Sequence, residues 1–343
     1  MKKNNKSAYA QAGVDIDIMM NSLKRIGHKV KQTNTKGVVS ELGTFGGLFK
    51  SPGKDYLLVS SIDGVGTKLK IAHMANKHKT VGQDLVNHCV NDILVQGAKP
   101  LFFLDYLGTA ALKPKVFEDV IHGFCKACRE NDMALLGGET AEMPGLYPKG
   151  EYDLVGTVIG AVERKKLVTG KKIKKGDIII GLPSTGLQTN GYSLARDIIF
   201  KKSKMKLSDN IPGTKVSFEK ALLSIHKSYL YPITALMKKI DINGMAHITG
   251  GGLYDNVPRI LPHNVDAVIR RECWKPQNIF SFMQSAGNIS TEEMFRVFNM
   301  GIGYVVIISK KDIDIALKSL KLAKQPAKVI GEIKKGEGNT VIV

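Results

Sequence analysis

Apolar and polar positions in the first half of the chain follow the periods of strands and helices in turn. Residues 56–62 (YLLVSSI), 100–107 (PLFFLDYL) and 152–162 (YDLVGTVIGAV) are apolar runs of strand length. Residues 80–96 instead repeat apolar side chains about every fourth position, which predicts a helix with a buried face. A second helix is expected from about Pro114, because proline fits the first turn of a helix.

The same alternation continues to the end of the chain. A short strand is predicted at 133–136, ending in the glycine-rich turn GGETAEMPG, and a lysine-rich link follows at 164–175. Beyond the link, strands are predicted at 177–182, 302–308, 327–333 and 340–343, and helices from Gly191, after HITGGG and at 312–323. We therefore predict an α/β (α+β) protein of two domains, residues 1–168 and 169–343.

The composition favours a globular protein, since 43% of the 343 residues are apolar and 24% are charged. No run approaches the ~20 apolar residues that span a bilayer, so no membrane partner is expected. The basic start MKKNNK has no apolar segment behind it, which argues against a secretory signal and favours the cytoplasm. Cys125 and Cys128 form a lone CxxC in a predicted helix, and we interpret them as reduced thiols because no second pair of metal ligands accompanies them.

The net charge of +19 comes largely from lysine clumps that contain almost no aromatic residues. We interpret these clumps as solvated surface that attracts phosphorylated substrates over a distance. A basic nucleic-acid-binding protein is the alternative from another functional class, but no recognised nucleic-acid motif is present and no specific nucleic acid is expected. That alternative predicts salt-sensitive binding of duplexes without ATP turnover.

The first candidate site is the run Asp63-Gly64-Val65-Gly66-Thr67-Lys68, directly after a predicted strand. The ends of strands are where α/β folds place ligands. Glycines let backbone amides approach an anion, while threonine and lysine donate to phosphate oxygens. The carboxylate requires Mg²⁺ between itself and a phosphate. The spacing differs from a Walker loop, and a simple tight turn has the same pattern.

Asp84, His88 and Asp92 recur every four residues along the helix predicted at 80–96, so they share one face. A metal-binding stripe has this spacing, and so does a polar edge that faces solvent. For this stripe considered alone, the solvent-facing edge is the commoner outcome.

Two acidic residues, Glu139 and Glu142, lie beside Thr140 in the glycine-rich segment 137–145. Loops of this kind often bind ligands. Together with Asp63 and Asp92, the two glutamates would supply the hard oxygen ligands that Mg²⁺ prefers.

Two loops of the second half join a predicted strand to a predicted helix. Residues 184–191 contain Asn190, a natural N-cap, and residues 247–252 read HITGGG. Amides at a helix N-terminus bind phosphate, although glycine and asparagine also serve plain connections. Three consecutive glycines are costly in chain entropy, which favours ligand contact.

These segments, in this order, closely resemble the aminoimidazole ribonucleotide synthetase (AIR synthase) family over nearly the whole chain. The matching motifs are YAQAGVDID from Tyr9, FGGLF at 45–49, DGVGTK at 63–68, CVNDI at 89–93, PLFFLDYLG at 100–108, GGETAEMPG at 137–145, TNGYSLAR at 189–196, HITGGG at 247–252 and EMFRVFNMGIG at 293–303. DGVGTK alone belongs to a wider superfamily, whereas GGETAEMPG and AGVDID point to this family.

The resemblance implies that the first domain's mixed sheet pairs with its copy in a homodimer and closes a β-barrel, with the second α/β domain packed beside it. It implies ATP and Mg²⁺, with a monovalent cation as a further option, and formylglycinamidine ribonucleotide (FGAM) as substrate. Phosphoryl transfer to the amide oxygen, followed by attack of nitrogen, would close the imidazole ring and give aminoimidazole ribonucleotide (AIR), ADP and phosphate. Such chemistry asks the protein mainly for positioning and charge neutralisation.

Roles then follow by match to the motifs. His247, Lys68 and Asp92 are the predicted catalytic residues, with His247 as general acid or base because imidazole titrates near neutrality. Metal would be held by Asp63, Asp92, Glu139 and Glu142. The residues predicted to bind ATP or phosphate are Asp63, Gly64, Gly66, Thr67, Lys68, Glu139, Thr140, Asn190, Thr249, Gly250, Gly251 and Gly252.

The chain departs from the family at two positions. Gln188 stands where the family usually has histidine, so an acid/base role there is in doubt. Gly27 follows Arg25-Ile26 where the family commonly has lysine, with Lys29 and Lys31 nearby. His88 falls where relatives can carry an apolar residue, which favours the solvent-facing interpretation for it.

Other ATP-using members of the superfamily match less well. Selenophosphate-forming enzymes carry a reactive Cys or selenocysteine near the start, whereas Cys89 is the first cysteine here. Hydrogenase maturation proteins end in cysteine, and this chain ends in Val343. The larger amidotransferase relative needs far more chain and a glutaminase nucleophile, and the enzymes that phosphorylate thiamine phosphate also match less well.

Overall fold

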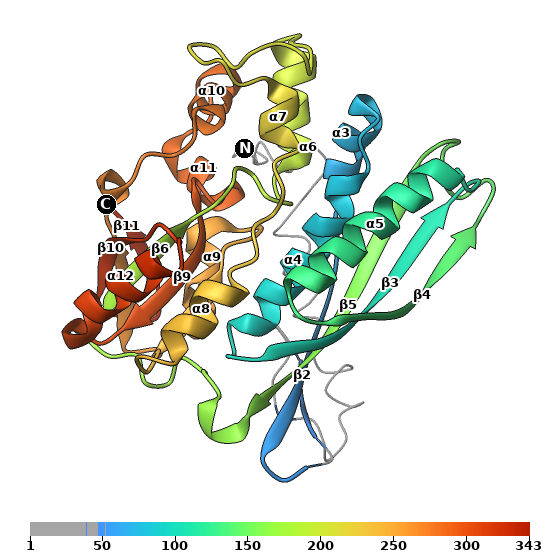
Figure 1. Ribbon diagram of the computed structural model, residues 1–343. Coiled ribbons are helices and arrows are strands. Elements are labelled where there is room, and N and C mark those ends of the chain that lie inside the picture. Colours follow the sequence, from blue (N-terminus) through green and yellow to red (C-terminus); the bar gives the residue numbers. More distant parts are fainter. Residues whose placement is uncertain (1–38, 40–46, 52) are drawn as a thin grey trace, which may run out of the picture.

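The structure is a computed structural model that describes residue 39, residues 47–51 and residues 53–343. The motif at 9–17 and Gly27 lie outside the described residues. Two β-sheets with their helices lie beside each other (Figure 1). Of the described helices, none is long and apolar enough to cross a membrane. The division predicted at residue 168 falls in the segment that joins the two sheets.

The first sheet has five strands and is mixed. In spatial order the strands are β1 (Gly47–Lys50), β2 (Tyr56–Gly64), β5 (Tyr152–Glu163), β3 (Lys99–Thr109) and β4 (Ala134–Glu142). Among these five described strands, only β3 and β4 pair in parallel. Helices α4 (Lys79–Leu94) and α5 (Pro114–Glu130) pack together against one face, and α3 (Lys68–Ala75) follows β2. The predicted helices and strands of this half are confirmed, with the exception of the length of β4.

Strand β4 is longer than predicted. The segment expected to be a glycine-rich turn continues the strand through Glu142, because it pairs in register with β3 as far as Thr109. Gly138 faces the Asp105 side chain, whose Oδ1 would lie 2.3 Å from a Cβ at that position. Glu139, Thr140 and part of the motif therefore lie on a sheet edge, and the predicted loop was wrong.

The described part of the chain gives the second sheet six strands. In spatial order they are β11 (Thr340–Ile342), β8 (Val265–Ile269), β10 (Lys328–Lys335), β6 (Ile178–Pro183), β9 (Ile302–Ile308) and β7 (Gly244–His247). Its helices are α6 (Tyr192–Arg196), α7 (Phe218–Leu222), α8 (Leu230–Met237), α9 (Gly252–Asn256), α10 (Asn278–Gly287), α11 (Thr291–Val297) and α12 (Ile313–Leu322). Strand β9, which lies between β6 and β7, is buried along its whole length, which explains its unbroken apolar sequence.

Helix α4 is the element that joins the two halves. Its apolar side chains pack on β2 and β5, and its polar side chains are buried as well, because residues 224–229 of the second half run along them. Asp84 accepts from the amide of His226 (2.7 Å), and Asn91 accepts from the amide of Tyr229 (2.9 Å). The solvent-facing interpretation of the Asp84–His88–Asp92 stripe was therefore wrong. Periodicity does not distinguish solvent from a polar domain interface.

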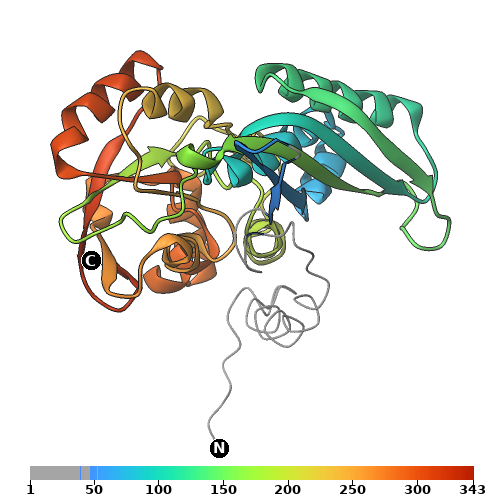
Figure 2. The same cartoon turned by 90° about the horizontal axis from the view of Figure 1, so that it is seen from below.

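The other face of the first sheet carries exposed apolar side chains. Ile62 on β2, Leu104 on β3 and Leu136 on β4 are 65%, 37% and 63% exposed. Figure 2 shows this sheet edge-on, with α5 along one side. Strand β5 also has one buried and one more accessible face, since its residues alternate strictly between buried and half-buried. A sheet that buries one face against helices leaves the alternate positions for another partner.

All four cysteines are free thiols, and Cys125 and Cys128 lie on α5 as predicted.

Candidate active site

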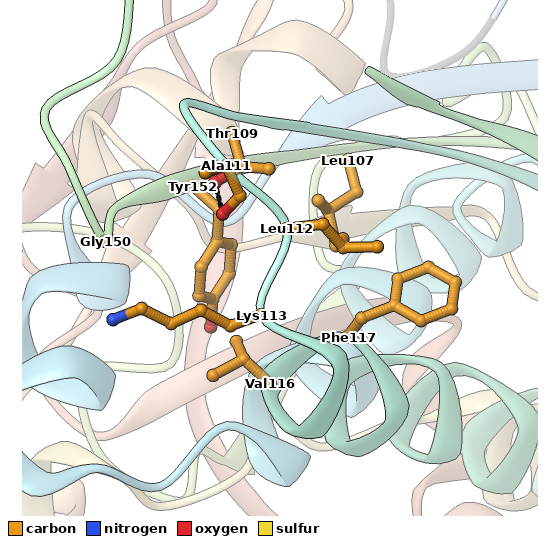
Figure 3. A pocket seen from close by; sticks show the side chains of 9 residues that line it. All are labelled: Leu107, Thr109, Ala111, Leu112, Lys113, Val116, Phe117, Gly150 and Tyr152. Atoms are coloured by element: carbon orange, nitrogen blue, oxygen red, sulfur yellow. Dashed lines mark hydrogen bonds between the residues drawn. The ribbon is translucent and has the colours of Figure 1, made fainter. Parts of the chain in front are cut away.

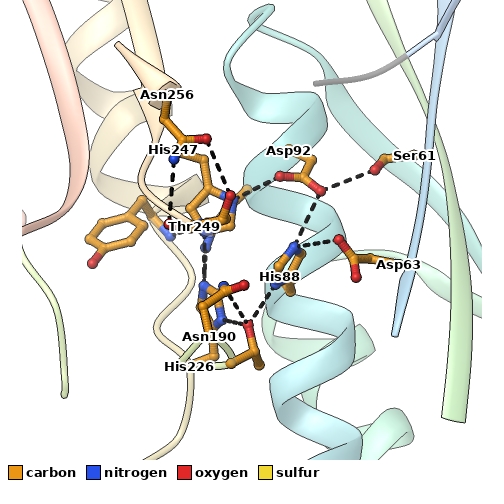
Figure 4. Close-up of polar contacts among 12 residues, drawn as sticks. Ser61, Asp63, His88, Asp92, Asn190, His226, His247, Thr249 and Asn256 are labelled. Atoms are coloured by element: carbon orange, nitrogen blue, oxygen red, sulfur yellow. Dashed lines mark hydrogen bonds and ion pairs between the residues drawn. The ribbon is translucent and has the colours of Figure 1, made fainter. Parts of the chain in front are cut away.

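A buried polar cluster lies where α4 and the end of β2 meet the second domain (Figure 4). His88 Nε2 is 2.8 Å from Asp63 Oδ2 and 3.6 Å from Asp92 Oδ2. The imidazole thus lies between Asp63 and Asp92, two of the four carboxylates that the sequence analysis assigned to metal. Ser61 donates to Asp92 Oδ2 at 3.1 Å, and the amide of Gly64 donates to Asp63 at 2.6 Å.

The charges of this cluster depend on one another. Burial disfavours the His88 imidazolium, but Asp63 and Asp92 outweigh it and raise the pKa of His88 to about 9. Burial likewise opposes ionisation of Asp63, yet the charge and hydrogen bond of His88 outweigh it and lower the pKa of that carboxyl. At neutral pH, His88 is therefore a buried cation between two carboxylates.

The second domain supplies the other half of the cluster. His247, at the end of β7, places Nδ1 2.8 Å from Asp92 Oδ1 and Nε2 3.0 Å from Nε2 of His226. Thr189 Oγ1 lies 3.2 Å from Nδ1 of His226 and 2.7 Å from Nδ1 of His88. These contacts close a ring that joins both domains: His247, His226, Thr189, His88 and Asp92.

Asn91 restricts the tautomer of His226. The Oδ1 atom of Asn91 accepts from the Tyr229 amide, so its Nδ2 is a donor, and it donates to the carbonyl of Lys227 (2.8 Å). The same Nδ2 lies 3.2 Å from Nε2 of His226. That nitrogen is therefore best suited to accept, and His247 is then the donor to it.

Both ring nitrogens of His247 are occupied, and its side chain is fully buried. Burial, opposed only in part by the hydrogen bond to Asp92, lowers the pKa of His247, and burial with neighbouring charges holds the pKa of His226 well below its usual range. His247 can exchange a proton with a substrate only through one of these partners or after the ring turns.

Lys68 does not project into the cluster. Its Nζ pairs with Asp84 Oδ2 (2.8 Å) and donates to the carbonyl of Ser224 (2.7 Å), and both charged side chains are fully buried. Burial lowers the pKa of Lys68 against the attraction of Asp84. Its neighbour Thr67 contacts Ser193 across the domain boundary, with 3.0 Å between the two hydroxyl oxygens.

The glycines of the two candidate loops serve different purposes. Gly66 has φ +67° and nothing near the position of a Cβ, so it meets a backbone requirement. At Gly252 a Cβ would lie 1.9 Å from the carbonyl oxygen of Phe295, which gives a packing reason for glycine there. Gly250 is different, since only the Asn190 side chain approaches its Cβ position (3.3 Å).

The loop that contains Thr249 is held by Asn256. The amide of this side chain donates to the carbonyls of Gly250 (3.1 Å) and Gly252 (2.8 Å), and Thr249 donates to its oxygen (3.2 Å). Asn190 was expected to cap the following helix, but the N-cap of α6 is Gly191, with φ 78° and no side-chain cap bond. The Asn190 side chain instead donates to Thr189 Oγ1 (3.4 Å).

The structure does not bring Glu139 and Glu142 to the Asp63–Asp92 pair. Gly64 pairs with Val155, Val155 with Tyr106, and Tyr106 with Glu139, so Glu139 lies three strands away in the same row. At about 4.8 Å per strand this places its backbone ~14 Å from that of Gly64. Glu142 accepts from the amide of Leu112 (2.6 Å). Within one chain, the four predicted carboxylates do not form one ligand set.

The sequence analysis missed His226 and Asn91. Asn91 lies on the helix predicted at 80–96, but the pair Asn87 and Asn91 consists of two neutral amides, which do not by themselves indicate a functional site. His226 lies in a segment without a motif, and only the structure shows that it contacts His247. Gln188, the departure from the family, is buried and donates to the hydroxyl of Tyr229 (3.2 Å).

Two hollows lie away from the cluster. One is lined by residues of β3, α5 and Tyr152 and has a volume of about 10 Å³, room for about one water (Figure 3). The other measures about 530 Å³ and lies where the link between the sheets meets the end of α8, with Lys99, Lys166 and Lys238 in its lining. Neither includes a predicted site residue.

The two sheets and the buried polar cluster between them define a two-domain α/β protein with a candidate site at the domain boundary. Residues 44–162 match the N-terminal domain, and residues 174–343 the C-terminal domain, of AIR synthase related proteins. The chain belongs to this family.

Curated relatives are similar along their whole length. The phosphoribosylformylglycinamidine cyclo-ligase of Alkaliphilus oremlandii is 47% identical over 340 residues, which cover 98% of this chain and 100% of the relative. The protein of the same name from Thermoanaerobacter sp. strain X514 is 49% identical over 335 residues, covering 97% and 99%.

Solved structures share the fold at low identity. A thiamine-monophosphate kinase from Stenotrophomonas maltophilia has a TM-score of 0.61 at 16% identity, covering 93% of this chain and 95% of its own. The hydrogenase maturation protein HypE in complex with ATP has a TM-score of 0.61 at 17% identity, covering 96% and 92%.

Proposed function

We propose that this chain closes the imidazole ring of aminoimidazole ribonucleotide from formylglycinamidine ribonucleotide, with ATP converted to ADP and phosphate, as a cytoplasmic step of purine synthesis. The observation that carries the proposal is the full-length identity of 47% to a protein named for this ligation. The paired carboxylates at the domain boundary support it, because they can hold a Mg²⁺ ion, and ATP chemistry requires a cation to offset the charge of the phosphates.

Mg²⁺ fits the Asp63–Asp92 pair. Both side chains offer oxygen, and a cation, the His88 imidazolium, lies between them in this structure. A bound Mg²⁺ would neutralise charge on the phosphoryl group during transfer. Glu139 stays a predicted contact of nucleotide and metal, and Glu142 a predicted metal ligand, both on β4 at the far edge of the sheet. No observation favours a monovalent cation.

The loops that face each other across the boundary supply the nucleotide contacts of the proposal. The side chain of Asp63 is 43% exposed, so it remains accessible to a ligand. Thr67, Gly66 and the backbone around Gly250 present hydroxyl and amide donors suited to phosphate. Lys68 contributes through Asp84: its ion pair fixes α3 to α4 and thereby positions the loop that precedes α3.

Ring closure requires that one nitrogen of the substrate lose a proton. In the proposal, that proton enters the ring of hydrogen bonds at His247, and His226 and Thr189 connect this imidazole to His88. Asp92 contacts both and stabilises whichever ring is charged.

We further propose that the exposed apolar face of the first sheet binds a second copy of the chain. Three large apolar side chains, Ile62, Leu104 and Leu136, are exposed on three strands of one sheet. Exposed apolar surface of this kind is typical of interfaces. Glu139 lies on β4, the strand that carries the exposed Leu136, and pairs with Tyr106 on β3. A homodimer formed through this sheet would therefore bring Glu139 near the partner.

The decisive experiment mixes the purified protein with ATP, Mg²⁺ and the formamidine substrate and follows imidazole product and ADP together. Equal amounts of both are expected. Asp63→Asn should lower the rate by about 100-fold or more, because several kcal/mol of charge stabilisation are lost. Asp132→Asn, an exposed turn position, is the matched control. Wild-type rates in Asp63→Asn would remove the metal-holding role.

A further inference from the structure

We infer that His88, Asp92 and His247 form a binding site for a first-row transition-metal dication such as Zn²⁺ or Co²⁺ in the nucleotide-free protein. Among the described residues, these are the one group of at least three histidine, cysteine or acidic side chains whose ligand atoms all lie within 4.8 Å of one another. All three side chains are buried.

The spacing of the ligand atoms fits such an ion. His247 Nδ1 lies 2.8 Å from Asp92 Oδ1, and His88 Nε2 lies 3.6 Å from Asp92 Oδ2. Ligand atoms of a tetrahedral Zn²⁺ with bonds near 2.0 Å are about 3.3 Å apart, between these two values. Asp63 Oδ2, 2.8 Å from the same nitrogen of His88, supplies a further oxygen at the edge of the site.

Each of the three proposed ligand side chains is oriented by a further hydrogen-bond partner. The second nitrogen of His88 contacts Thr189 (2.7 Å), and the second nitrogen of His247 contacts His226 (3.0 Å). Ser61 donates to Asp92. Metal-binding histidines in proteins almost always have such a partner on the other ring nitrogen, and it fixes which nitrogen is free to bind.

Asn91 favours the tautomer that a metal needs. Its Nδ2 must donate, so Nε2 of His226 accepts, and Nε2 of His247 carries the proton. The other nitrogen of His247, Nδ1, then faces the Asp92 carboxylate and requires a positive group between them. That group is a second proton, which makes His247 a buried cation, or a metal ion bound to the lone pair.

Two imidazole nitrogens determine the class of ion. Nitrogen ligands suit Zn²⁺, Co²⁺ and Ni²⁺, whereas Mg²⁺ prefers oxygen alone. The ion would use Asp92, which the proposed function assigns to Mg²⁺, so the two ions would compete. The inference concerns the protein without nucleotide, and its test does not depend on ring closure.

The test uses tag-free, full-length protein freed of metal by a chelator and titrated with Co²⁺. Wild type should take up one Co²⁺ per chain and show the intense visible absorption of a four-coordinate ion, which one equivalent of Zn²⁺ abolishes. His88→Leu should lower Co²⁺ affinity at least ~100-fold and lose this spectrum. His226→Phe should weaken binding ~10-fold to 100-fold, because it removes only the orienting contact. His122→Ala, an exposed histidine on α5, is the matched control and should behave as wild type.

If the His88→Leu variant does not fold, the Co²⁺ spectrum of the wild type by itself tests the inference. The weak spectrum of a six-coordinate Co²⁺, or no binding, overturns the inference. Unchanged affinity in a folded His88→Leu protein overturns it too. Loss of ring closure with an intact Co²⁺ spectrum would count against the proposed function and leave the metal site standing.

Discussion

Lys68 and Asp84 form a fully buried ion pair, with 2.8 Å between Nζ and Oδ2. The pair connects the phosphate-loop candidate, which ends at Lys68, to the helix that carries His88 and Asp92. Removal of one partner would leave an uncompensated charge in the interior.

Lys68→Met is therefore expected to destabilise the protein by about 3–5 kcal/mol, measured by urea unfolding. The double variant Lys68→Met/Asp84→Leu should recover part of this loss, since neither charge remains. Equal destabilisation by the single and double variants would mean that the pair does not explain the effect. Lys70→Met, from a half-exposed pair with Glu151, should cost no more than about 1 kcal/mol.

Stability should fall as the pH rises above neutrality. The pKa of His88 is about 9 in the folded protein and about 6.5 when unfolded, so its stabilising contribution is complete below pH 6.5 and is lost as the pH passes 9. The change amounts to at most about 3 kcal/mol. Urea unfolding between pH 6.5 and 9.5 measures it. A His88→Met protein with the same slope over this range would show that other groups cause it.

The rate of ring closure should depend on His247. If His247 accepts the substrate proton, the rate falls on the acid side of its pKa, which burial places below the usual 6.5. His247→Gln should lower the rate and remove this acid limb, whereas His263→Gln, an exposed histidine, should leave both unchanged. An acid limb that persists in His247→Gln would assign the proton to another group.

The exposed sheet face should control assembly. Ile62→Glu introduces a charge where the proposed interface buries an isoleucine, so sedimentation should show monomers where the wild type is dimeric. Ile315→Glu, an exposed isoleucine on α12, serves as control because it lies on the second domain. A stable Ile62→Glu dimer would place the interface elsewhere.

Sequence periodicity was sufficient for most of the fold. The helix at 80–96 and the strands at 56–62, 100–107 and 152–162 were predicted to within a few residues, because each has one apolar face or is apolar throughout. β4 was underestimated. Its glycines predict a turn from local propensity alone, and only the pairing with β3 makes them a strand.

The sequence predicted which acidic residues lie together where an acidic residue falls at the end of a strand or on the buried face of a helix. Asp63 and Asp92 were assigned together, and the structure brings both to His88. The burial of Lys68 could not be read from DGVGTK, because its partner Asp84 has the same polar appearance as a surface residue. His226 was missed since its role depends on a contact with His247, 21 residues away.

The contacts of residues 224–229 with α4 couple the unfolding of one half of the molecule to that of the other. Asn87 donates to the His226 carbonyl (2.7 Å) and Asn91 to that of Lys227 (2.8 Å), so these bonds break if either half melts. Calorimetry should consequently record a single endotherm for the described body of the chain. The second half produced without the first would expose residues 224–229, because it would lack the α4 side chains that bind them.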